Sequence, residues 1–428
     1  MNKIIDYFIV FAVCIIAVPA LSGAVDQRDG MLSNLIQEAL ENNPKLEAAI
    51  QGTLSAEKAI PQAGALPDPQ LSFGLSNLPV DSFAFSQDPM TGKVIGVMQM
   101  FPFPGKLSLA TDIAEFEAAA IRHQQDEVRN LIIQMVKQTF LDLYAVERAL
   151  ETTQKNKALM EQFVHVAETK YATGSGLQQD VLRAQLEFSK LEDDLIMWQQ
   201  RRLSVVARLN ALLNRPAHTL IEKTDPELML PDDPVIIFPA EKIERIRPLL
   251  MAWNERIQKA EAAIKLAKRD IWPNFMISAS YRQRNDLADG KQMTDFFSAS
   301  VSLNIPLYFN RKQKAKVAEK ELSFNKIKAE YENVKNNVLS EIESILAELE
   351  RNRKRVELYK GGILLQAQQS LESAHAGYRV GKVDFLTLIN NWMMLQNYEL
   401  QYFFALSNYY KSLAHYELAV GGNVVQKN

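Results

Sequence analysis

Two very long segments that favour unbroken helices constrain the fold of this sequence most. Residues 107–171 contain neither proline nor glycine, the two residues that most strongly disfavour a helix interior. At about 1.5 Å per residue, a helix over this segment is a rod of roughly 100 Å. Residues 311–376, interrupted only by Gly361 and Gly362, predict a second rod of similar length. Such helices do not fit inside a compact domain, so we expect an elongated molecule.

The chain also repeats itself. Residues 204 positions apart match over much of its length. The matched positions are Pro44 and Pro248, Ala56-Glu57 and Ala260-Glu261, Pro69 and Pro273, and Phe101-Pro102 and Ile305-Pro306. Further along, the offset becomes 207, which aligns Tyr171 with Tyr378 and Gly174 with Gly381. An offset that holds over so many positions indicates two copies of one unit.

Each copy has the same predicted order: a first helix (31–65 and 241–270), two strands, a very long helix, a glycine-containing turn and a last helix. A connector between the copies carries five of the 17 prolines, which is typical of irregular structure. The predicted divisions are a signal peptide 1–24, a first repeat 25–213, a connector 214–240, a second repeat 241–420 and a tail 421–428. Within the repeats we expect strand hairpins at 69–101 and 274–305, and helices at 107–171, 178–213, 311–378 and 383–420.

The N-terminus has the features of a secretory signal. Lys3 precedes an apolar run over residues 8–19, and the small residues that follow predict cleavage after Ala24. The apolar run is shorter than the ~20 residues that a membrane span needs. Cys14, the only cysteine, lies inside this signal, and we interpret it as not lipidated. The mature chain then has no disulfide and no thiolate metal site.

The predicted strands have one apolar and one polar face. Residues 296–305 place apolar side chains at odd positions and, from 298, serine or asparagine at even positions; residues 71–76 and 275–282 alternate similarly, and 93–101 less cleanly. This period of two indicates a sheet with two different faces. Runs of about ten residues suit tilted membrane strands. A half-buried sheet of a soluble protein also fits this pattern alone.

Aromatic residues favour the membrane alternative. Five of them fall where strands are predicted to meet helices, the position of an interfacial aromatic girdle: Phe101, Phe103, Trp272, Tyr308 and Phe309. The opposite ends of the hairpins, 79–92 and 284–294, are longer and polar, as expected of outward loops.

Four strands cannot close a membrane barrel, for which about eight is the working minimum. An open sheet edge in lipid leaves backbone groups unpaired, at a cost of several kcal/mol each. The chain must therefore pool strands with copies of itself. Two subunits would supply eight strands and three subunits twelve, and the four helices of each subunit favour the wider pore.

The long helices fit two arrangements. Ile342, Leu349, Val356 and Ile363 are spaced by seven, which is a heptad seam. A plain coiled-coil rod and a wall of helices around a wet channel both use such seams. The duplicated hairpins favour the wall, because a rod needs no barrel.

Sequence motifs predict no enzyme and no cofactor. The five histidines are scattered, and none pairs at metal-ligand spacing. Gly174-Ser175-Gly176 lacks the following Lys-Ser/Thr of a phosphate-binding loop. With 48 basic and 51 acidic residues, the net charge of −3 predicts no nucleic-acid partner. Energy for any transport must come from a partner.

Several motifs together carry a family resemblance: Asn43-Pro44, Pro67-Asp68-Pro69, Phe101-Pro102-Phe103-Pro104-Gly105-Lys106, and the turns that begin at Tyr171 and Tyr378. They resemble the outer-membrane efflux protein family of the TolC type, over essentially all of the mature chain. The resemblance implies a mainly α fold with β structure. It implies a homotrimer whose twelve-stranded outer-membrane β-barrel continues as a periplasmic α-helical barrel in a Gram-negative bacterium. The implied partners are outer-membrane lipid, a periplasmic adaptor and an inner-membrane pump of the resistance-nodulation-division type.

In that family, the two glycine turns form the periplasmic tip that meets the adaptor. The resemblance assigns this role to Tyr171, Gly174, Gly176, Leu177, Tyr378, Gly381, Lys382 and Val383. Some members narrow the tip with aspartates six and nine residues after the second glycine, where this chain has Thr387 and Asn390. Asp180 holds the equivalent place after the first glycine, and Asp384 lies nearby. These four residues are the candidate constriction, which we expect to be closed at rest and opened by the adaptor.

Three functions remain open at this point. The leading one is a passive duct of a tripartite efflux system; the others are the duct of an ATP-driven protein secretion system and a periplasmic coiled-coil protein without a pore. The segments 77–83 and 101–106 also resemble family members linked to heavy-metal efflux. Met98, Met100, Met393 and Met394 fit soft-metal traffic or ordinary apolar packing.

Overall fold

The computed structural model describes residues 30–224, 228–231, 235 and 237–422, so the predicted signal peptide with Cys14 and Ala24 lies outside the described residues. The helices and strands, in chain order, are α1 (Gly30–Asn42), α2 (Pro44–Gly64), β1 (Gln70–Ser76), β2 (Gly92–Phe101), α3 (Lys106–Ala172), α4 (Gln178–Leu212), α5 (Ala240–Ile246), α6 (Pro248–Arg269), β3 (Phe275–Gln283), β4 (Phe296–Leu303), α7 (Gln313–Leu358), the π-helical segment η2 (Tyr359–Ile363), α8 (Leu364–Arg379) and α9 (Phe385–Val420).

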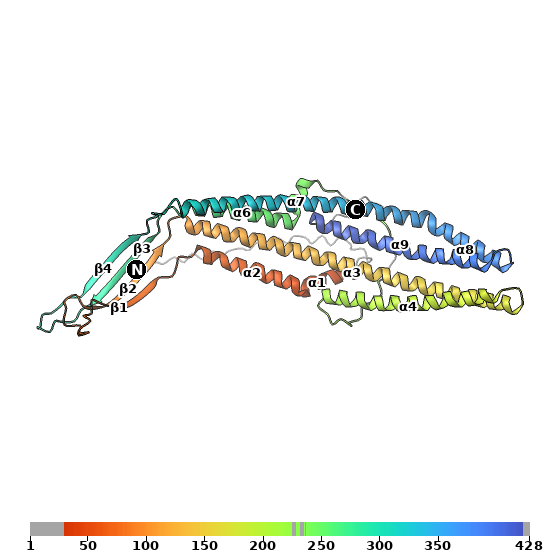
Figure 1. Cartoon of the computed structure of the whole chain (residues 1–428), viewed down its shortest axis with the longest axis horizontal. Coiled ribbons are helices and arrows are strands. Elements are labelled where there is room, and N and C mark those ends of the chain that lie inside the picture. The colour runs from red at the N-terminus through yellow and green to blue at the C-terminus, as the bar shows by residue number, and fades with distance from the viewer. Residues whose placement is uncertain (1–29, 225–227, 232–234, 236, 423–428) are drawn as a thin grey trace, which may run out of the picture.

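The molecule is elongated, with the sheet at one end and, at the other, the two turns that connect α3 to α4 and α8 to α9 (Figure 1). Helix α3, with 67 residues, runs from the sheet to the far turn. The expectation of a mainly α fold with a small antiparallel sheet is confirmed. Among the described helices, none is long and apolar enough to cross a membrane.

The first helix of each copy is two helices, so the prediction of a single one was wrong. The breaks fall at Asn43, with φ −71° and ψ 120°, and at Arg247, with φ −76° and ψ 118°. Both residues precede a proline, and the proline ring disfavours the helical region for the preceding residue. Proline itself fits the first turn of the next helix. The Asn43 side chain accepts a hydrogen bond from Lys45 N (2.9 Å) and thereby caps α2.

The four strands form one antiparallel sheet in the order β1-β2-β3-β4. Its two central strands, β2 and β3, come from different copies of the repeat and pair from Lys93 with Gln283 to Phe101 with Phe275. The ends of the sheet are therefore β1 and β4, and within the described residues each is hydrogen-bonded to a strand on one side only.

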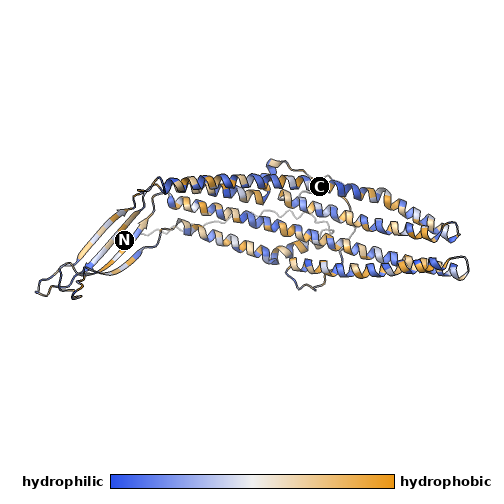
Figure 2. Ribbon diagram, viewed as in Figure 1, coloured by the Kyte–Doolittle hydropathy of each residue, from blue (hydrophilic) through white to orange (hydrophobic). Residues whose placement is uncertain are grey.

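The apolar core is a series of clusters along the rod. One joins α1, α3 and α4 around Leu143, a second joins α3, α4, α8 and α9 near the turns, and a third joins α6, α7 and α9. Apolar and polar residues are interspersed along the whole length of the helices (Figure 2). Each helix therefore buries a narrow stripe against its neighbours, as expected of a layer of parallel rods.

The predicted heptad seam is buried at Ile342, Leu349 and Val356. Ile363 is only half-buried, because it lies in η2. Gly361 and Gly362 also lie in η2, so they do not end the helix but form part of one wide turn between α7 and α8. A π turn inserts a residue into the helical repeat and shifts the phase of the buried stripe.

The connector between the two copies is tied to α3 and α4 by a buried carboxylate. Glu147 accepts hydrogen bonds from Thr224 N (2.7 Å) and from Arg202 Nε (2.9 Å). Asn210 Nδ2 donates to Ala217 O and Thr219 O. These contacts hold the described part of the proline-rich segment against the rods without regular secondary structure.

Replacement of a core residue tests this packing. Leu143→Ala removes a fully buried side chain and is expected to lower the free energy of unfolding by about 2–5 kcal/mol. Chemical denaturation of the full chain in detergent, followed by the loss of helical circular dichroism, measures this. Leu220, which is 89% exposed in the connector, supplies the control Leu220→Ala, for which less than about 0.5 kcal/mol is expected. Equal losses in the two variants contradict the assignment of the core.

Candidate functional site

The sheet exposes a broad apolar face. The strand register aligns Phe73, Ile95, Tyr281 and Phe297 in one row across all four strands. Phe73 and Phe297 are 73% and 74% exposed, and Val301 is 68% exposed. Contiguous rows of exposed aromatic and aliphatic side chains mark a surface that interacts with another protein or with a membrane.

The opposite face of the same sheet is small and polar. Ser72, Gly96, Ser280 and Ser298 form one of its rows. In the next row, the hydroxyls of Ser278 and Ser300 lie 2.8 Å apart and share a hydrogen bond. A face of this composition tolerates contact with water.

Strand β2 departs from the pattern, as its sequence predicts. The register places Met98 and Met100 on the serine face, and Lys93 and Gln99 on the apolar face. Met393 and Met394 lie in α9, close to the turns at the far end of the rod. The four methionines considered for soft-metal traffic are therefore not gathered in one place. Within the described residues, no group of three or more His, Cys, Asp or Glu could hold a metal ion.

The predicted aromatic cluster lies where the sheet meets the helices. Phe103 stacks on Trp272 with 5.2 Å between ring centroids, and on Phe275 at 6.4 Å. Trp272, Tyr308 and Phe309 are exposed, and Phe101 is half-buried. The structure thus brings Phe103 and Trp272 together, and places Tyr308 and Phe309 on the segment between β4 and α7.

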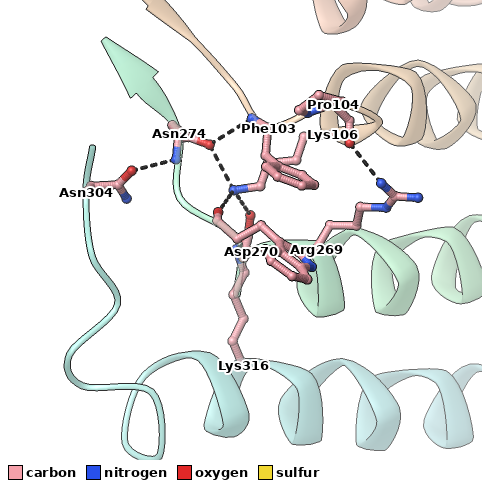
Figure 3. A network of polar contacts seen from close by, with 9 residues as sticks. Phe103, Pro104, Lys106, Arg269, Asp270, Asn274, Asn304 and Lys316 are labelled. Atoms are coloured by element: carbon pink, nitrogen blue, oxygen red, sulfur yellow. Dashed lines mark hydrogen bonds and ion pairs between the residues drawn. The ribbon is translucent and has the colours of Figure 1, made fainter. Parts of the chain in front are cut away.

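A buried lysine, which the sequence showed only as the last residue of a family motif, connects the sheet to the helices (Figure 3). Lys106 Nζ donates to Trp272 O (3.0 Å) and to Asn274 Oδ1 (2.9 Å), and lies 3.4 Å from Asp270 Oδ1. Asn274 N donates in turn to Asn304 Oδ1 (2.6 Å). Burial of an ammonium group requires such partners. The network therefore fixes where β2, β3 and β4 continue into helices.

At the opposite end, the two glycine turns have the same backbone. Gly174 has φ 70° and Gly381 has φ 74°, in the left-handed region that favours glycine. Ser175 N donates to Lys170 O, and Lys382 N donates to Gly377 O, both at 2.9 Å. These pairs are related by the repeat offset of 207, so the two copies build the same helix ending.

The side chains of the two turns differ in burial. Tyr171, Gly174, Leu177, Gly381 and Lys382 are exposed, and Gly176 and Val383 are half-buried. Tyr378, in contrast, is only 4% exposed. Its ring contacts Phe385, with 5.3 Å between centroids, and burial raises its pKa to about 12. The Tyr378 side chain therefore packs the turn from inside and is covered within the single chain.

Lys170 connects one turn to the other, a role that the sequence analysis did not predict. Its Nζ donates to Tyr378 O (2.6 Å) and lies 4.5 Å from the centre of the Tyr378 ring. Lys170 precedes the Tyr171 motif, and the equivalent position in the second copy is Gly377. Only the loss of symmetry at this position could have singled it out.

The four candidate constriction residues occupy the starts of α4 and α9. Asp384 caps α9, because its Oδ1 accepts a hydrogen bond from Thr387 N (2.7 Å). Hydrogen bonds from the Thr387 side chain and from its backbone N–H lower the pKa of Asp384. Partial burial, together with the nearby Asp384 carboxylate, raises the pKa of Asp180. Thr387 and Asn390 are exposed. The structure thus brings Asp180 and Asp384 within electrostatic reach of each other.

A substitution at Lys170 tests the link between the turns. Lys170→Gln removes a charged hydrogen bond, typically worth about 1.5–3 kcal/mol, and the ring contact with Tyr378. We expect the amide protons of residues 377–385 to exchange at least about tenfold faster, as measured by hydrogen–deuterium exchange. Lys382→Gln, an exposed lysine in the sister turn, is the matched control. Equal protection in the two variants would mean that Lys170 does not stabilise the second turn.

Comparison with known proteins gives one consistent result. The family model described as outer membrane efflux protein matches residues 35–215 and 241–421. The outer membrane efflux protein BepC of Brucella suis biovar 1 (strain 1330) is 23% identical over 398 residues, which cover 90% of this chain and 85% of BepC. Nodulation protein T of Rhizobium leguminosarum bv. trifolii is 22% identical over 409 residues, which cover 92% of this chain and 86% of nodulation protein T.

Solved structures share the fold. The outer-membrane channel OprN matches with a TM-score of 0.79 at 16% identity, covering 93% of this chain and 91% of OprN. The outer membrane protein VceC of Vibrio cholerae matches with a TM-score of 0.78 at 20% identity, over 92% of this chain and 97% of VceC. CusC, described as undergoing transmembrane channel formation, matches with a TM-score of 0.77 at 19% identity, over 94% and 96%.

Proposed function

We propose that this chain, which belongs to the outer membrane efflux protein family, is one of three identical subunits of a passive export duct. It is an outer-membrane protein and not an enzyme. In the proposed assembly, three four-stranded sheets close a twelve-stranded barrel. The helices of the three chains continue that barrel as a tunnel into the periplasm.

The observation that carries this proposal is the sheet. Its apolar face is exposed, its other face is lined by serines, and each of its end strands pairs on one side only in the part of the chain that the structure describes. Backbone groups in lipid must be hydrogen-bonded, so β1 of one subunit would pair with β4 of the neighbouring subunit. The apolar rows would then face lipid, and the serine rows would face a water-filled lumen.

We propose the divisions 25–213, 214–240, 241–420 and 421–428 as the functional parts of the mature chain, after a signal peptide 1–24. The two repeats would each contribute one hairpin to the barrel and long helices to the tunnel. The turns around Gly174 and Gly381 would form the periplasmic tip that contacts an adaptor. An inner-membrane pump, of the resistance-nodulation-division type, would supply the energy.

The family match favours the duct over a coiled-coil protein without a pore. Service to an ATP-driven protein secretion system remains the alternative within the duct class. Affinity purification of the full chain after mild cross-linking separates the two. Recovery of a resistance-nodulation-division pump with its adaptor supports efflux, and recovery of an ATP-driven transporter supports secretion.

Charge placed on either face of the sheet tests the barrel. Val301→Arg puts a guanidinium on the proposed lipid face and is expected to cost about 2–4 kcal/mol near the bilayer midplane. Ser298→Arg places the same group on the serine face of the same strand, where water can solvate it. We expect the first variant to lose trimers from outer-membrane fractions and the second to retain them, as judged by heat-modifiable migration on gels.

Normal trimer yield from Val301→Arg, or equal loss in both variants, would contradict the assignment of the faces. A wild-type chain that stays a soluble monomer and gives no conductance in planar bilayers would refute the duct itself.

A second test concerns the tip, which we propose is closed at rest. Asp180 lies within electrostatic reach of Lys170, the residue that ties the two turns together. Asp180→Lys places a second ammonium beside Lys170 and should loosen this contact. We expect a higher single-channel conductance in planar bilayers. Asp193→Lys, on an exposed part of the same helix, is the control. Unchanged conductance in Asp180→Lys removes Asp180 from the constriction.

A further inference from the structure

A groove of about 750 Å³ lies below the sheet, between the start of α3 and the end of α6. Phe103 and Trp272 line its upper part with a stacked aromatic pair, and Trp272 is 55% exposed. Lys265, Lys268 and Arg269, from the last turns of α6, line the same groove. Aromatic rings and cationic side chains thus share one concave surface.

The groove continues the apolar face of the sheet. Phe103 stacks on Phe275, and the register places Phe275 in a row with Phe101 and Leu303. This row has the same parity along the strands as the rows of Phe73 and Val301, so all of them point to one face. A molecule that lies along the apolar face would therefore reach the groove at its lower end.

The surroundings of the groove are strongly basic. The segments 104–108, 264–274 and 305–318 contain eight lysines or arginines and one carboxylate, Asp270. That carboxylate is held by Lys106 and by Lys316 Nζ at 2.5 Å. The Asp270 carboxylate is therefore already paired with these two lysines at the buried junction (Figure 3). The positive charge of the three groove residues is not cancelled by it.

The existing contacts of the three basic side chains leave them able to bind a ligand. Lys265 and Lys268 make solvent-exposed ion pairs with Glu261 (2.9 Å) and Glu321 (3.5 Å). Such exposed pairs contribute little and exchange readily. Arg269 Nη1 donates to Pro104 O (2.8 Å), which holds the guanidinium over Gly105. Its other N–H groups can still donate to a phosphate, for which the planar guanidinium is well shaped.

The groove also lies away from the proposed contacts between subunits. It is formed by α3, which follows β2, and by α6, which precedes β3. These two strands are the centre of the sheet, whereas a second copy would pair with β1 and β4. Neighbouring sheets in the assembly would therefore leave this surface open to the membrane.

We propose that this groove binds the headgroup of an anionic phospholipid from the periplasmic leaflet of the outer membrane. The acyl chains would lie on the apolar face, the ester region against Phe103 and Trp272, and the phosphate beside Lys265, Lys268 and Arg269. This inference rests on the proposed membrane barrel. Aromatic rings at the interface and cations just outside it are the arrangement that membrane-surface electrostatics favours.

Quenching of Trp272 fluorescence tests the site. The full-length trimer is reconstituted into phosphatidylcholine vesicles that carry a minor fraction of brominated phosphatidylglycerol or of brominated phosphatidylcholine. Bromine quenches only at short range, and Trp198, Trp253 and Trp392 lie in helices away from the sheet. We expect stronger quenching by the anionic lipid, and loss of that signal in Trp272→Phe.

Lys265→Gln combined with Lys268→Gln should lower the relative affinity for brominated phosphatidylglycerol by about tenfold, since each basic side chain near the surface contributes several-fold. The matched control is Lys326→Gln combined with Lys354→Gln, two α7 lysines with similar exposed carboxylate partners. Lys326 lies 13 residues into α7, about 20 Å along the helix, where the membrane charge is screened.

Each outcome decides the proposal. Preference for the anionic lipid that is lost in the groove variant and kept in the control supports it. Equal quenching by the two lipids, or an unchanged preference in the groove variant, overturns it. Competition by soluble glycerol phosphate at the same concentration would show a site for free phosphate instead of lipid, which also overturns it. A chain that does not insert into vesicles at all refutes the barrel and not this site alone.

Discussion

Backbone hydrogen bonding at the ends of the sheet is the constraint on which the proposed assembly depends. The four strands pair in sequence, and β1 and β4 each leave one edge without a partner in the described chain. In water such edges are tolerated, but in lipid each unpaired group costs several kcal/mol. In lipid, a sheet with an exposed apolar face and two open edges would be stable only if further subunits completed it. The elongated shape has a separate cause, which is the 67-residue helix α3 that runs from the sheet to the far turn.

The junction between the sheet and the helices sets the orientation of the sheet relative to the helices. Lys106 is buried where three oxygen atoms, from Trp272, Asn274 and Asp270, surround its ammonium group. A buried charge with this many partners allows little variation in how the strands leave the rods. The same junction carries the stacked Phe103 and Trp272 rings and the basic end of α6. One small region therefore sets the orientation of the sheet and presents the proposed lipid site.

The far end of the molecule shows how a duplication diverges. The two turns share their positive-φ glycines and their backbone hydrogen bonds, as the repeat predicted. Their side chains do not correspond: Lys170 stands where the second copy has Gly377, and its ammonium reaches across to Tyr378. Asp180 is partly buried near Asp384, and Asp384 caps α9. The candidate constriction is therefore built from different chemistry in each copy.

The sequence by itself determined the periodic features: the two long rods, the duplicated order of elements, the alternation of the strands and the glycine turns. These depend on local propensity and on spacing, which a sequence displays directly. It also contained the breaks before Pro44 and Pro248, although a single helix was predicted across each. Only the tertiary structure decided which faces of the strands align, that Lys106 is buried, and that Lys170 reaches Tyr378. The pairing of β2 with β3 and the contacts of Lys106 with Trp272 and of Lys170 with Tyr378 join residues more than 150 positions apart, and no local pattern encodes such contacts.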